Sequence, residues 1–222
     1  MRFHTEALIF DMDGVLADTE PFHIRAWELA MRDASPATMN GEESRRLFIR
    51  ERERMTGMAS VEIARELIRL FDMHLTVEEL LSVKRGFYRS LVTKDLALFP
   101  GLLEELSRWR DIPLALATSS SRGEAEFMIS RLGVREIFDP IVTSDDVKRA
   151  KPAPDCYLLA AARLGASPGD CVVIEDSGHG IRAALAAGAR VLAVEAAVPP
   201  GDIEGVTEVF PSTVEALRWL RG

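Results

Sequence analysis

Acidic side chains follow two apolar runs of this 222-residue chain, each time directly where the run ends. Asp11 and Asp13 come after the first run, and Glu175 and Asp176 come after a later one. A short unbroken apolar run is typical of a strand that is buried on both faces. In an open α/β sheet, ligands bind beyond the carboxyl ends of the strands. If the two strands are near neighbours, three or four carboxylates converge at one edge of the sheet.

Such a group of carboxylates needs a positive charge. Two like charges 4 Å apart repel by roughly 4 kcal/mol at an effective dielectric constant of about 20. Without a cation, the carboxylates would take up protons or move apart. Magnesium prefers oxygen ligands and binds through one or two carboxylates together with a substrate phosphate. The sequence therefore predicts a Mg²⁺ site, with Asp11, Asp13, Glu175 and Asp176 as candidate ligands.

Two further polar motifs, 117–120 and 151–155, supply a hydroxyl group and a lysine. A carboxylate can accept a phosphoryl group as a nucleophile, and Asp11 suits this role because it lies nearest to its strand. Asp13 could act as the general acid and base. Phosphoryl transfer depends mostly on positioning and on charge neutralisation. We expect Lys151 to supply positive charge, and Thr118 with the backbone around Ser119 to donate hydrogen bonds.

Each of these motifs also has an ordinary structural explanation. Taken alone, an Asp-x-Asp-Gly segment is a common turn, and residues 118–120 could cap a helix. Residues 151–152 could be a surface loop, and residues 175–178 could be a turn that enters a helix. The four motifs, however, occur in order along the chain, each at the end of an expected strand. This joint arrangement favours chemistry, and it predicts a magnesium-dependent phosphoryl-transfer enzyme.

The expected strands alternate with amphipathic helical patterns. Several of these patterns end at a glycine, which readily takes the left-handed conformation that stops a helix. Strands that alternate with helices of this length indicate right-handed βαβ units and a parallel sheet. The fold class expected is therefore α/β, with a doubly wound, Rossmann-like core. The strands are predicted at residues 7–10, 112–117, 140–143, 171–174 and 190–194.

Residues 18–96 interrupt this alternation, because they contain helical patterns and no convincing strand. Thr76 and Glu79 form a capping-box signature for one of the helices. A row of arginines and glutamates between residues 42 and 54 is typical of a solvated helix face. We predict an all-helical cap domain at residues 18–96, inserted into a core of residues 1–17 and 97–222, with hinges near 16–20 and 94–100. The helices are predicted at residues 21–31, 42–54, 60–71 and 77–92.

The composition excludes several classes of partner. The formal charge of −8 argues against nucleic acid, whose phosphate backbone requires a basic surface. No uncharged apolar run approaches the roughly 18 residues that a membrane span requires, and a strand expected from Ala7 leaves no room for a signal peptide.

Cys156 and Cys171 are expected to be reduced, buried thiols. We expect a cytoplasmic protein, a monomer, with a small phosphorylated metabolite as its partner.

The segments DMDGVLADTE, LALATSSS, KPAPD and VVIEDSGHGI occur in this order and together resemble the haloacid dehalogenase-like hydrolase superfamily, in the branch with a helical cap. The resemblance implies that Asp11 is the nucleophile, Asp13 the acid and base, and Lys151 the charge-neutralising lysine. It also implies that Thr118 binds phosphate, that Asp176 is a metal ligand supported by Glu175, and that Asp11 and the Asp13 carbonyl bind the metal. The resemblance further implies that the halide-releasing members lack an acid two residues after the nucleophile, so Asp13 argues against dehalogenase activity.

The sequence of the predicted cap is compatible with more than one activity. Residues 22–27 resemble the first cap helix of β-phosphoglucomutases, in which the histidine, here His23, faces the active site. Residues 56–60 resemble the specificity loop of that group, but Val61 and Glu62 follow where the mutases carry an arginine; Lys84 or Arg85 could compensate for its loss. We predict a phosphatase acting on a small phosphorylated metabolite such as a sugar phosphate. A β-phosphoglucomutase-type isomerase is the first alternative, and a non-catalytic binding protein on the same fold is the second.

Overall fold

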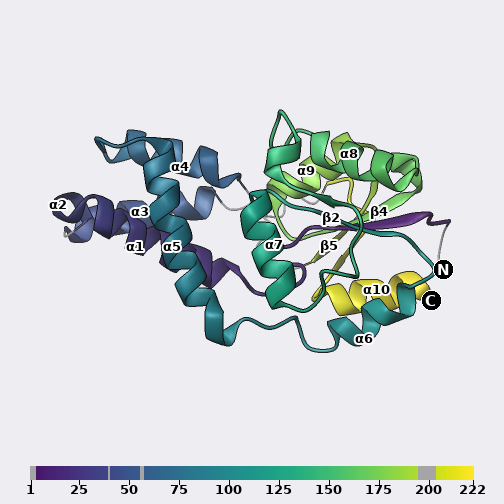
Figure 1. Ribbon diagram of the computed structural model, residues 1–222. Coiled ribbons are helices and arrows are strands. Elements are labelled where there is room, and N and C mark those ends of the chain that lie inside the picture. The colour runs from purple at the N-terminus through teal and green to yellow at the C-terminus, as the bar shows by residue number, and fades with distance from the viewer. Residues whose placement is uncertain (1–3, 40, 56–57, 195–203) are drawn as a thin grey trace. The chain divides into compact units, whose positions relative to one another are not determined.

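The computed structural model describes residues 4–39, 41–55, 58–194 and 204–222 (Figure 1). Over this range the chain divides into two compact units, one formed by residues 1–18 and 97–222 and the other by residues 19–96. The first unit is built around a parallel β-sheet, whereas the second is entirely helical in its described residues. The predicted fold class is confirmed.

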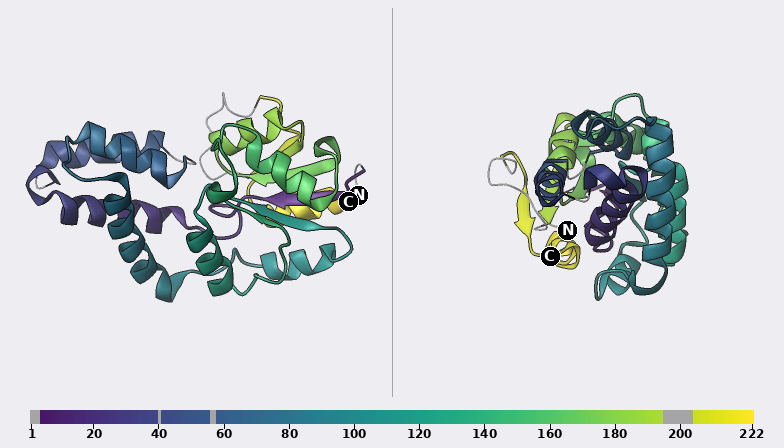
Figure 2. Two further views of the ribbon diagram at one scale, coloured as in Figure 1. Left: turned by 45° about the horizontal axis from the view of Figure 1, so that its top comes forward. Right: turned by 90° about the vertical axis from the view of Figure 1, so that its left-hand side faces the viewer.

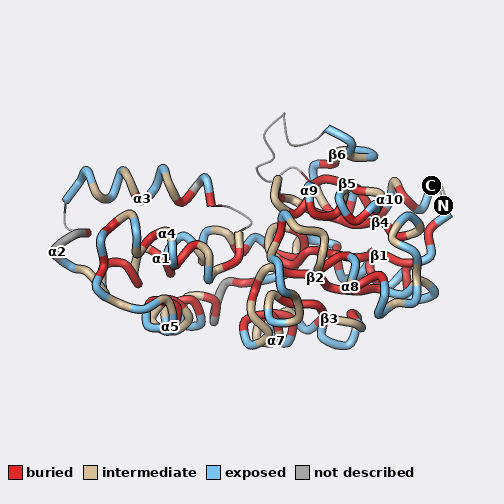
Figure 3. Tube along the Cα trace, turned by 90° about the horizontal axis from the view of Figure 1, so that it is seen from above, coloured by how far each residue is buried: buried red, intermediate tan, exposed pale blue. Residues whose placement is uncertain are grey.

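The sheet has six strands in the described residues, in the order β3-β2-β1-β4-β5-β6, and all neighbouring strands run parallel. Every residue of the four central strands except the first of β5 is buried, as Figure 3 shows along the tube. This explains why these strands could be recognised as unbroken apolar runs. The strands are β1 (Ala7–Phe10), β2 (Leu114–Ala117), β3 (Ile141–Val142), β4 (Cys171–Glu175), β5 (Arg190–Val194) and β6 (Glu208–Phe210).

Helices cover both faces of this sheet. Helices α8 and α9 lie on one face, and α6 and α10 lie on the other (Figure 1). Small side chains such as Ala160 and Ala184 pack with Ile9 and Val173 of the sheet in one buried cluster. The helices of this unit are α6 (Leu102–Leu106), α7 (Arg122–Arg131), α8 (Asp155–Leu164), α9 (Gly178–Ala186) and α10 (Thr213–Arg221), with short 3₁₀ turns at Ser107–Trp109, Ser144–Asp146 and Pro168–Asp170.

The end of the chain differs from the sequence-based expectation. The patterns above predict no element after Val194, but β6 and α10 follow it. Strand β6 has only three residues, and just one of them is buried, so it lacks the apolar run that marks the central strands. The predicted second and third strands are also longer than β2 and β3, whose bounds leave out Ile112, Pro113, Pro140 and Thr143.

The helical unit has its own apolar core. Helix α1 packs against α5, which also packs against α4 (Figure 2). Trp27, Phe48, Leu67 and Leu80 are buried in one cluster drawn from four helices. The helices of this unit are α1 (Glu20–Ala34), α2 (Pro36–Met39), α3 (Glu42–Arg54), α4 (Ser60–Leu70) and α5 (Val77–Asp95).

Two polar features of this unit can be compared with the predictions from the sequence. The predicted capping box is present, because the Thr76 hydroxyl accepts a hydrogen bond from the Glu79 N–H while the Glu79 carboxylate accepts one from the Thr76 N–H. These hydrogen bonds lower the pKa of Glu79. The arginine row of α3 is not uniformly solvated, because the Arg52 side chain is buried and pairs with Glu20 of α1. One arginine of this row therefore joins two helices.

Candidate active site

The acidic motifs meet because β1 and β4 are neighbours in the sheet. Phe10 pairs with Ile174 in the parallel ladder, so Asp11 and Glu175 occupy equivalent positions, Glu175 as the last residue of β4 and Asp11 just beyond β1. The Asp11 N–H donates to the Ile174 carbonyl at 3.0 Å. Strand β2 lies on the other side of β1 and ends at Ala117. Three of the four motifs therefore begin at the same edge of the sheet.

Asp11, Glu175 and Asp176 form a compact group of carboxylates. Each offers one oxygen, and these oxygens all lie within 4.8 Å of one another. Burial is the main reason that the pKa of Asp11 rises to about 7, and the neighbouring acids Glu175 and Asp13 raise it further. Burial and the same neighbours also raise the pKa of Asp176 well above its usual range. The protein alone thus does not support full ionisation of this group.

Asp13 lies two residues further along, half-buried, and its carboxylate is outside this group of three. The Ser120 hydroxyl donates to Asp13 Oδ2 at 3.3 Å, which links the first and second motifs. Thr118 is buried, and its hydroxyl oxygen accepts a hydrogen bond from the Ser120 N–H at 3.0 Å. Ser119 lies between them in the same turn and is half-buried. The second motif therefore lies beside the first, as expected.

The Lys151 ammonium group lies between two of the acids. Its Nζ donates to Asp11 Oδ1 at 2.7 Å, to Glu175 Oε1 at 2.8 Å and to the Ala117 carbonyl at 3.1 Å. Burial alone would lower the pKa of Lys151, but the attraction of the Asp11 and Glu175 carboxylates outweighs it and raises the pKa well above its usual value. Lys151 is therefore a buried cation in direct contact with Asp11.

Glu175 is held by hydrogen bonds at both oxygens. Its Oε1 accepts from Lys151 Nζ and from the Tyr157 hydroxyl, the latter at 2.7 Å. Its Oε2 accepts from the N–H groups of Asp176 and Ser177, both at 2.9 Å, and from the Ser177 hydroxyl at 3.1 Å. Burial would raise the pKa of Glu175, but Lys151 and these hydrogen bonds lower it overall. Glu175 is thus an ionised carboxylate with a fixed orientation.

Two glycines allow the loops to approach the acids closely. Gly14 has a φ of +72°, and a Cβ atom there would lie 1.8 Å from Asp176 Oδ2. A Cβ atom at Gly180 would lie 1.5 Å from Glu175 Oε1. Ser177 begins α9 at this point, with its hydroxyl accepting from the Gly180 N–H. The positions of both acids therefore depend on glycine opposite them.

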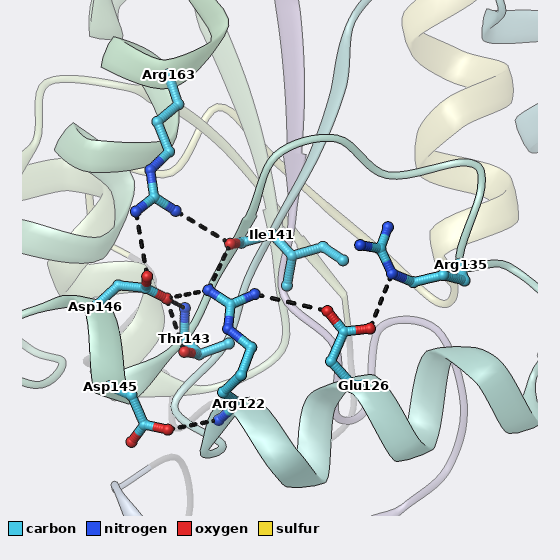
Figure 4. A network of polar contacts seen from close by, with 8 residues as sticks. All are labelled: Arg122, Glu126, Arg135, Ile141, Thr143, Asp145, Asp146 and Arg163. Carbon is cyan, nitrogen blue, oxygen red and sulfur yellow. Dashed lines mark hydrogen bonds and ion pairs between the residues drawn. The ribbon is translucent and has the colours of Figure 1, made fainter.

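The segment that leads to Lys151 begins in a polar network beside β3 (Figure 4). Asp146 accepts hydrogen bonds from Thr143, from Arg122 of α7 at 2.5 Å and from Arg163 of α8 at 3.1 Å. Both arginines also donate to the Ile141 carbonyl at the edge of the sheet. Burial opposes ionisation of Asp146, but hydrogen bonds from Thr143 and Arg163 and the charge of Arg122 lower its pKa to about 2. The network ties α7, α8 and β3 together.

Several members of this arrangement were not among the predicted site residues. Tyr157 has no role in the sequence-based prediction, since an aromatic residue in a helix is usually a core residue, and it is indeed buried in α8. Ser120, Ser177 and Gly180 lie inside the motifs but were not assigned roles there. These three residues lie close in sequence to the predicted site residues, so their positions could have indicated a role in the site. The contact of Tyr157 with Glu175 joins residues from different elements and has no such local signal.

The remaining predicted site residue, His23, belongs to the helical unit. It lies on α1, and its ring stacks on that of Tyr88 with centroids 4.2 Å apart. In the same unit Lys84 is buried, with Nζ 4.7 Å from the centroid of the Tyr88 ring. Thr56 and Gly57 of the expected specificity loop lie outside the described residues. Ser60, the last residue of that segment, is the first residue of helix α4.

Among the described residues, no helix has both the length and the apolar character to cross a bilayer. Cys156 and Cys171 are free and buried, as expected. Burial, the main cause, raises the pKa of each thiol to about 11. The two cysteines are therefore uncharged core residues.

Comparison with known proteins agrees with this geometry. Residues 5–188 match the model of the haloacid dehalogenase-like hydrolases. The chain is 37% identical over 182 residues to fructose-1-phosphate phosphatase YqaB of Escherichia coli (strain K12), covering 82% of this chain and 92% of that protein. It is 32% identical over 193 residues to β-phosphoglucomutase of Bacillus subtilis (strain 168), covering 82% and 80% respectively.

A solved structure shows the same fold. The crystal structure of CbbY from Rhodobacter sphaeroides in complex with phosphate superimposes with a TM-score of 0.77 and 29% sequence identity. The match covers 95% of this chain and 96% of that one. The family predicted from the four motifs is confirmed: this chain belongs to the haloacid dehalogenase-like hydrolases.

Proposed function

We propose that this protein is a Mg²⁺-dependent phosphatase that hydrolyses small phosphorylated metabolites, sugar phosphates in particular, through an aspartyl-phosphate intermediate. The observation that carries the proposal is the contact of buried Lys151 with Asp11, beside the carboxylate of Asp176 at the edge of the sheet. The relative YqaB, named as a fructose-1-phosphate phosphatase, supports a sugar phosphate as the class of substrate.

The acidic group fits a Mg²⁺ ion. Its donor atoms are all carboxylate oxygens, the hard ligands that Mg²⁺ prefers, and burial raises the pKa of Asp11 and Asp176 in the protein alone. Asp11 and Asp176 would hold the ion, together with the Asp13 carbonyl. Glu175 would support them from behind, because its two oxygens already accept hydrogen bonds from Lys151 and Ser177. When bound, Mg²⁺ would neutralise negative charge on the acids and on the transferring phosphoryl group.

The first chemical step uses the carboxylate of Asp11. One of its oxygens attacks phosphorus, the bond from phosphorus to the ester oxygen breaks, and Asp13 gives its proton to the leaving oxygen. Lys151 neutralises charge on the phosphoryl oxygens from the position where it now contacts Asp11. The Thr118 hydroxyl, whose oxygen accepts from Ser120, can direct its proton to a phosphoryl oxygen. Backbone N–H groups near Ser119 would add hydrogen bonds.

The second step restores the enzyme. Asp13, now ionised, takes a proton from water, which attacks the phosphorus atom of the aspartyl-phosphate. The bond between phosphorus and the Asp11 oxygen breaks, and inorganic phosphate leaves. Asp13 lies two residues from the nucleophile, and the Ser120 hydroxyl restrains its carboxylate for this exchange of protons.

We further propose that residues 18–96 are a cap that selects the leaving group, with His23 as a substrate contact. The segment 22–27 that resembles the β-phosphoglucomutases supports this role. Such a unit would exclude water from the reacting atoms and add contacts to the sugar, as substrate-closing domains do in other enzymes. Residues 1–17 and 97–222 would supply the chemistry.

A β-phosphoglucomutase-type isomerase is the second candidate, favoured by the 32% identity to the B. subtilis mutase. Against it, Val61 and Glu62 follow Ser60, where the mutases carry an arginine for a distal phosphate. Incubation with β-glucose 1-phosphate and a bisphosphate activator separates the two activities. A phosphatase releases inorganic phosphate, whereas glucose 6-phosphate as the main product would establish the isomerase.

The phosphatase is tested by measuring phosphate release from a panel of sugar phosphates and from a generic aryl phosphate, with Mg²⁺ and with a chelator. We expect release only with Mg²⁺. Asp11→Asn keeps the size of the side chain but removes the nucleophilic charge, so kcat should fall by a factor of at least ~10³, within the range that loss of a nucleophile causes. Undiminished activity of Asp11→Asn would overturn the mechanism.

A further inference from the structure

Tyr157, on the buried face of α8, contacts the acidic site. It is the third residue of that helix, 1% exposed, and its ring packs in the cluster between α8, α9 and the sheet. Its hydroxyl group nevertheless donates a hydrogen bond to Glu175 Oε1 at 2.7 Å. A tyrosine used only as a core residue has no need for this bond, since phenylalanine fills nearly the same volume.

The Tyr157 hydroxyl and the Lys151 ammonium group bind the same acceptor. Glu175 Oε1 accepts from Tyr157 and from Lys151 Nζ, so the tyrosine and the lysine share one oxygen. The Lys151 ammonium group also lies 4.7 Å from the centroid of the Tyr157 ring, a distance at which a cation is attracted by the ring face. Tyr157 therefore touches both partners of the Lys151–Glu175 pair.

The other oxygen of Glu175 is fixed by the start of α9, through the N–H groups of Asp176 and Ser177. Without the Tyr157 hydroxyl, Oε1 would retain Lys151 as its described partner, and the carboxylate could follow the lysine if the lysine moved. With the hydroxyl, the carboxylate is held from two directions, and the lysine has a fixed acceptor. Hydrogen bonds to charged groups are stronger than neutral ones and define geometry well.

We propose that Tyr157 is a positioning residue, which acts through Glu175 to hold Lys151 in place for the transferring phosphoryl group. This inference rests on the proposed phosphatase function. During transfer one Asp11 oxygen bonds to phosphorus and the side chain loses its negative charge, so the attraction between Lys151 and Asp11 weakens and the lysine can turn one N–H to a phosphoryl oxygen. The Glu175 oxygen held by Tyr157 and the Ala117 carbonyl keep the ammonium group in place while it does so.

The test is Tyr157→Phe, which keeps the ring and its contact with Lys151 and removes only the hydroxyl. We expect kcat to fall about tenfold, with KM for the sugar phosphate changed less than twofold, because the lysine is needed mainly in the transition state. The affinity for orthovanadate, which resembles the transferring phosphoryl group, should weaken by about the same factor as kcat. This binding is measured by calorimetry and does not depend on turnover.

The matched control is Ser212→Ala, which removes a helix-capping hydroxyl of the same unit, far along the chain in front of α10. We expect this variant to lower thermal stability slightly and to leave kcat, KM and vanadate affinity at the wild-type values. A fall in kcat for Ser212→Ala equal to that for Tyr157→Phe would show that loss of stability alone explains the effect, and would contradict the proposal.

Unchanged kcat and vanadate affinity in a folded Tyr157→Phe protein would overturn the positioning role, provided that the wild type is active. Loss of the folded state in Tyr157→Phe would overturn it equally, because the hydroxyl would then be needed for folding and not for orientation of the lysine. Absence of Mg²⁺-dependent phosphate release in the wild type is a different result, and it would reject the proposed function itself.

Discussion

At the residue scale, the site depends on how closely its loops approach two carboxylates. Gly180 faces Glu175 at a separation that leaves no room for a methyl group. Glu175 is itself fixed by Lys151, Tyr157 and Ser177, so it cannot move aside without loss of several hydrogen bonds. Glycine is required here by contact with a side chain, whereas at Gly14 the backbone conformation, with φ of +72°, adds a second reason.

This contact predicts the effect of Gly180→Ala. We expect the new methyl group to displace the Glu175 carboxylate, to lower kcat at least about tenfold, and to lower the free energy of unfolding by about 1–3 kcal/mol, the usual cost of overpacking. Steady-state kinetics and denaturant unfolding measure the two effects.

Gly123→Ala in α7 is the control, because a Cβ atom there meets nothing within 4 Å. It should leave kcat unchanged and should be neutral or slightly stabilising, since alanine is the better helix former. Equal effects of the two substitutions would argue against the described packing of Glu175.

At the scale of elements, Asp146 joins three pieces of the core unit, because it accepts hydrogen bonds from α7, α8 and the turn after β3. Its pKa in the folded protein is lowered to about 2. A lowered pKa contributes stability above the pKa of the unfolded chain, and this contribution is lost as the pH falls through the folded value.

We therefore expect Asp146→Asn to lower the free energy of unfolding at pH 7 by about 1–2 kcal/mol, after allowance for partial exposure of the carboxylate. The difference from the wild type should shrink as the pH falls from about 4 to about 2. Denaturant unfolding at several pH values provides the measurement, with Glu136→Gln, a change of an exposed acid, as the control. A difference that stays constant over this pH range would contradict the role of the charge.

Sequence patterns predicted much of this architecture, for physical reasons that can be named. The central strands are buried on both faces, so their apolar runs are visible without a structure, and acids at their ends must converge when the strands are adjacent. Strand β6 and the Tyr157–Glu175 contact could not be predicted in this way. The first is too short and exposed to leave a pattern, and the second joins residues whose proximity arises only when α8 packs on the sheet.

At the scale of the molecule, the two units have separate apolar cores, one between the sheet and α8 and α9 and the other among α1 to α5. Separate cores predict separate cooperative units. Leu67→Ala, in the fully buried core of the helical unit, should cost about 2–5 kcal/mol of local stability.

In Leu67→Ala, the amide hydrogens of residues 19–96 should then lose protection from exchange, while those of the sheet keep it. Val173→Ala, in the buried centre of β4, provides the matched comparison and should weaken protection across the sheet. Uniform loss of protection through the whole chain in Leu67→Ala would show that the two units unfold as one.

The central claim is that Asp11 takes up the phosphoryl group. The most direct measurement is acid quenching of the enzyme during turnover of a sugar phosphate, followed by mass spectrometry of the intact chain and its peptides. We predict one added phosphoryl group, located on Asp11, present with Mg²⁺ and absent both in its absence and in Asp11→Asn. Rapid turnover with no phosphorylated peptide, or with the phosphoryl group on another residue, would contradict the account.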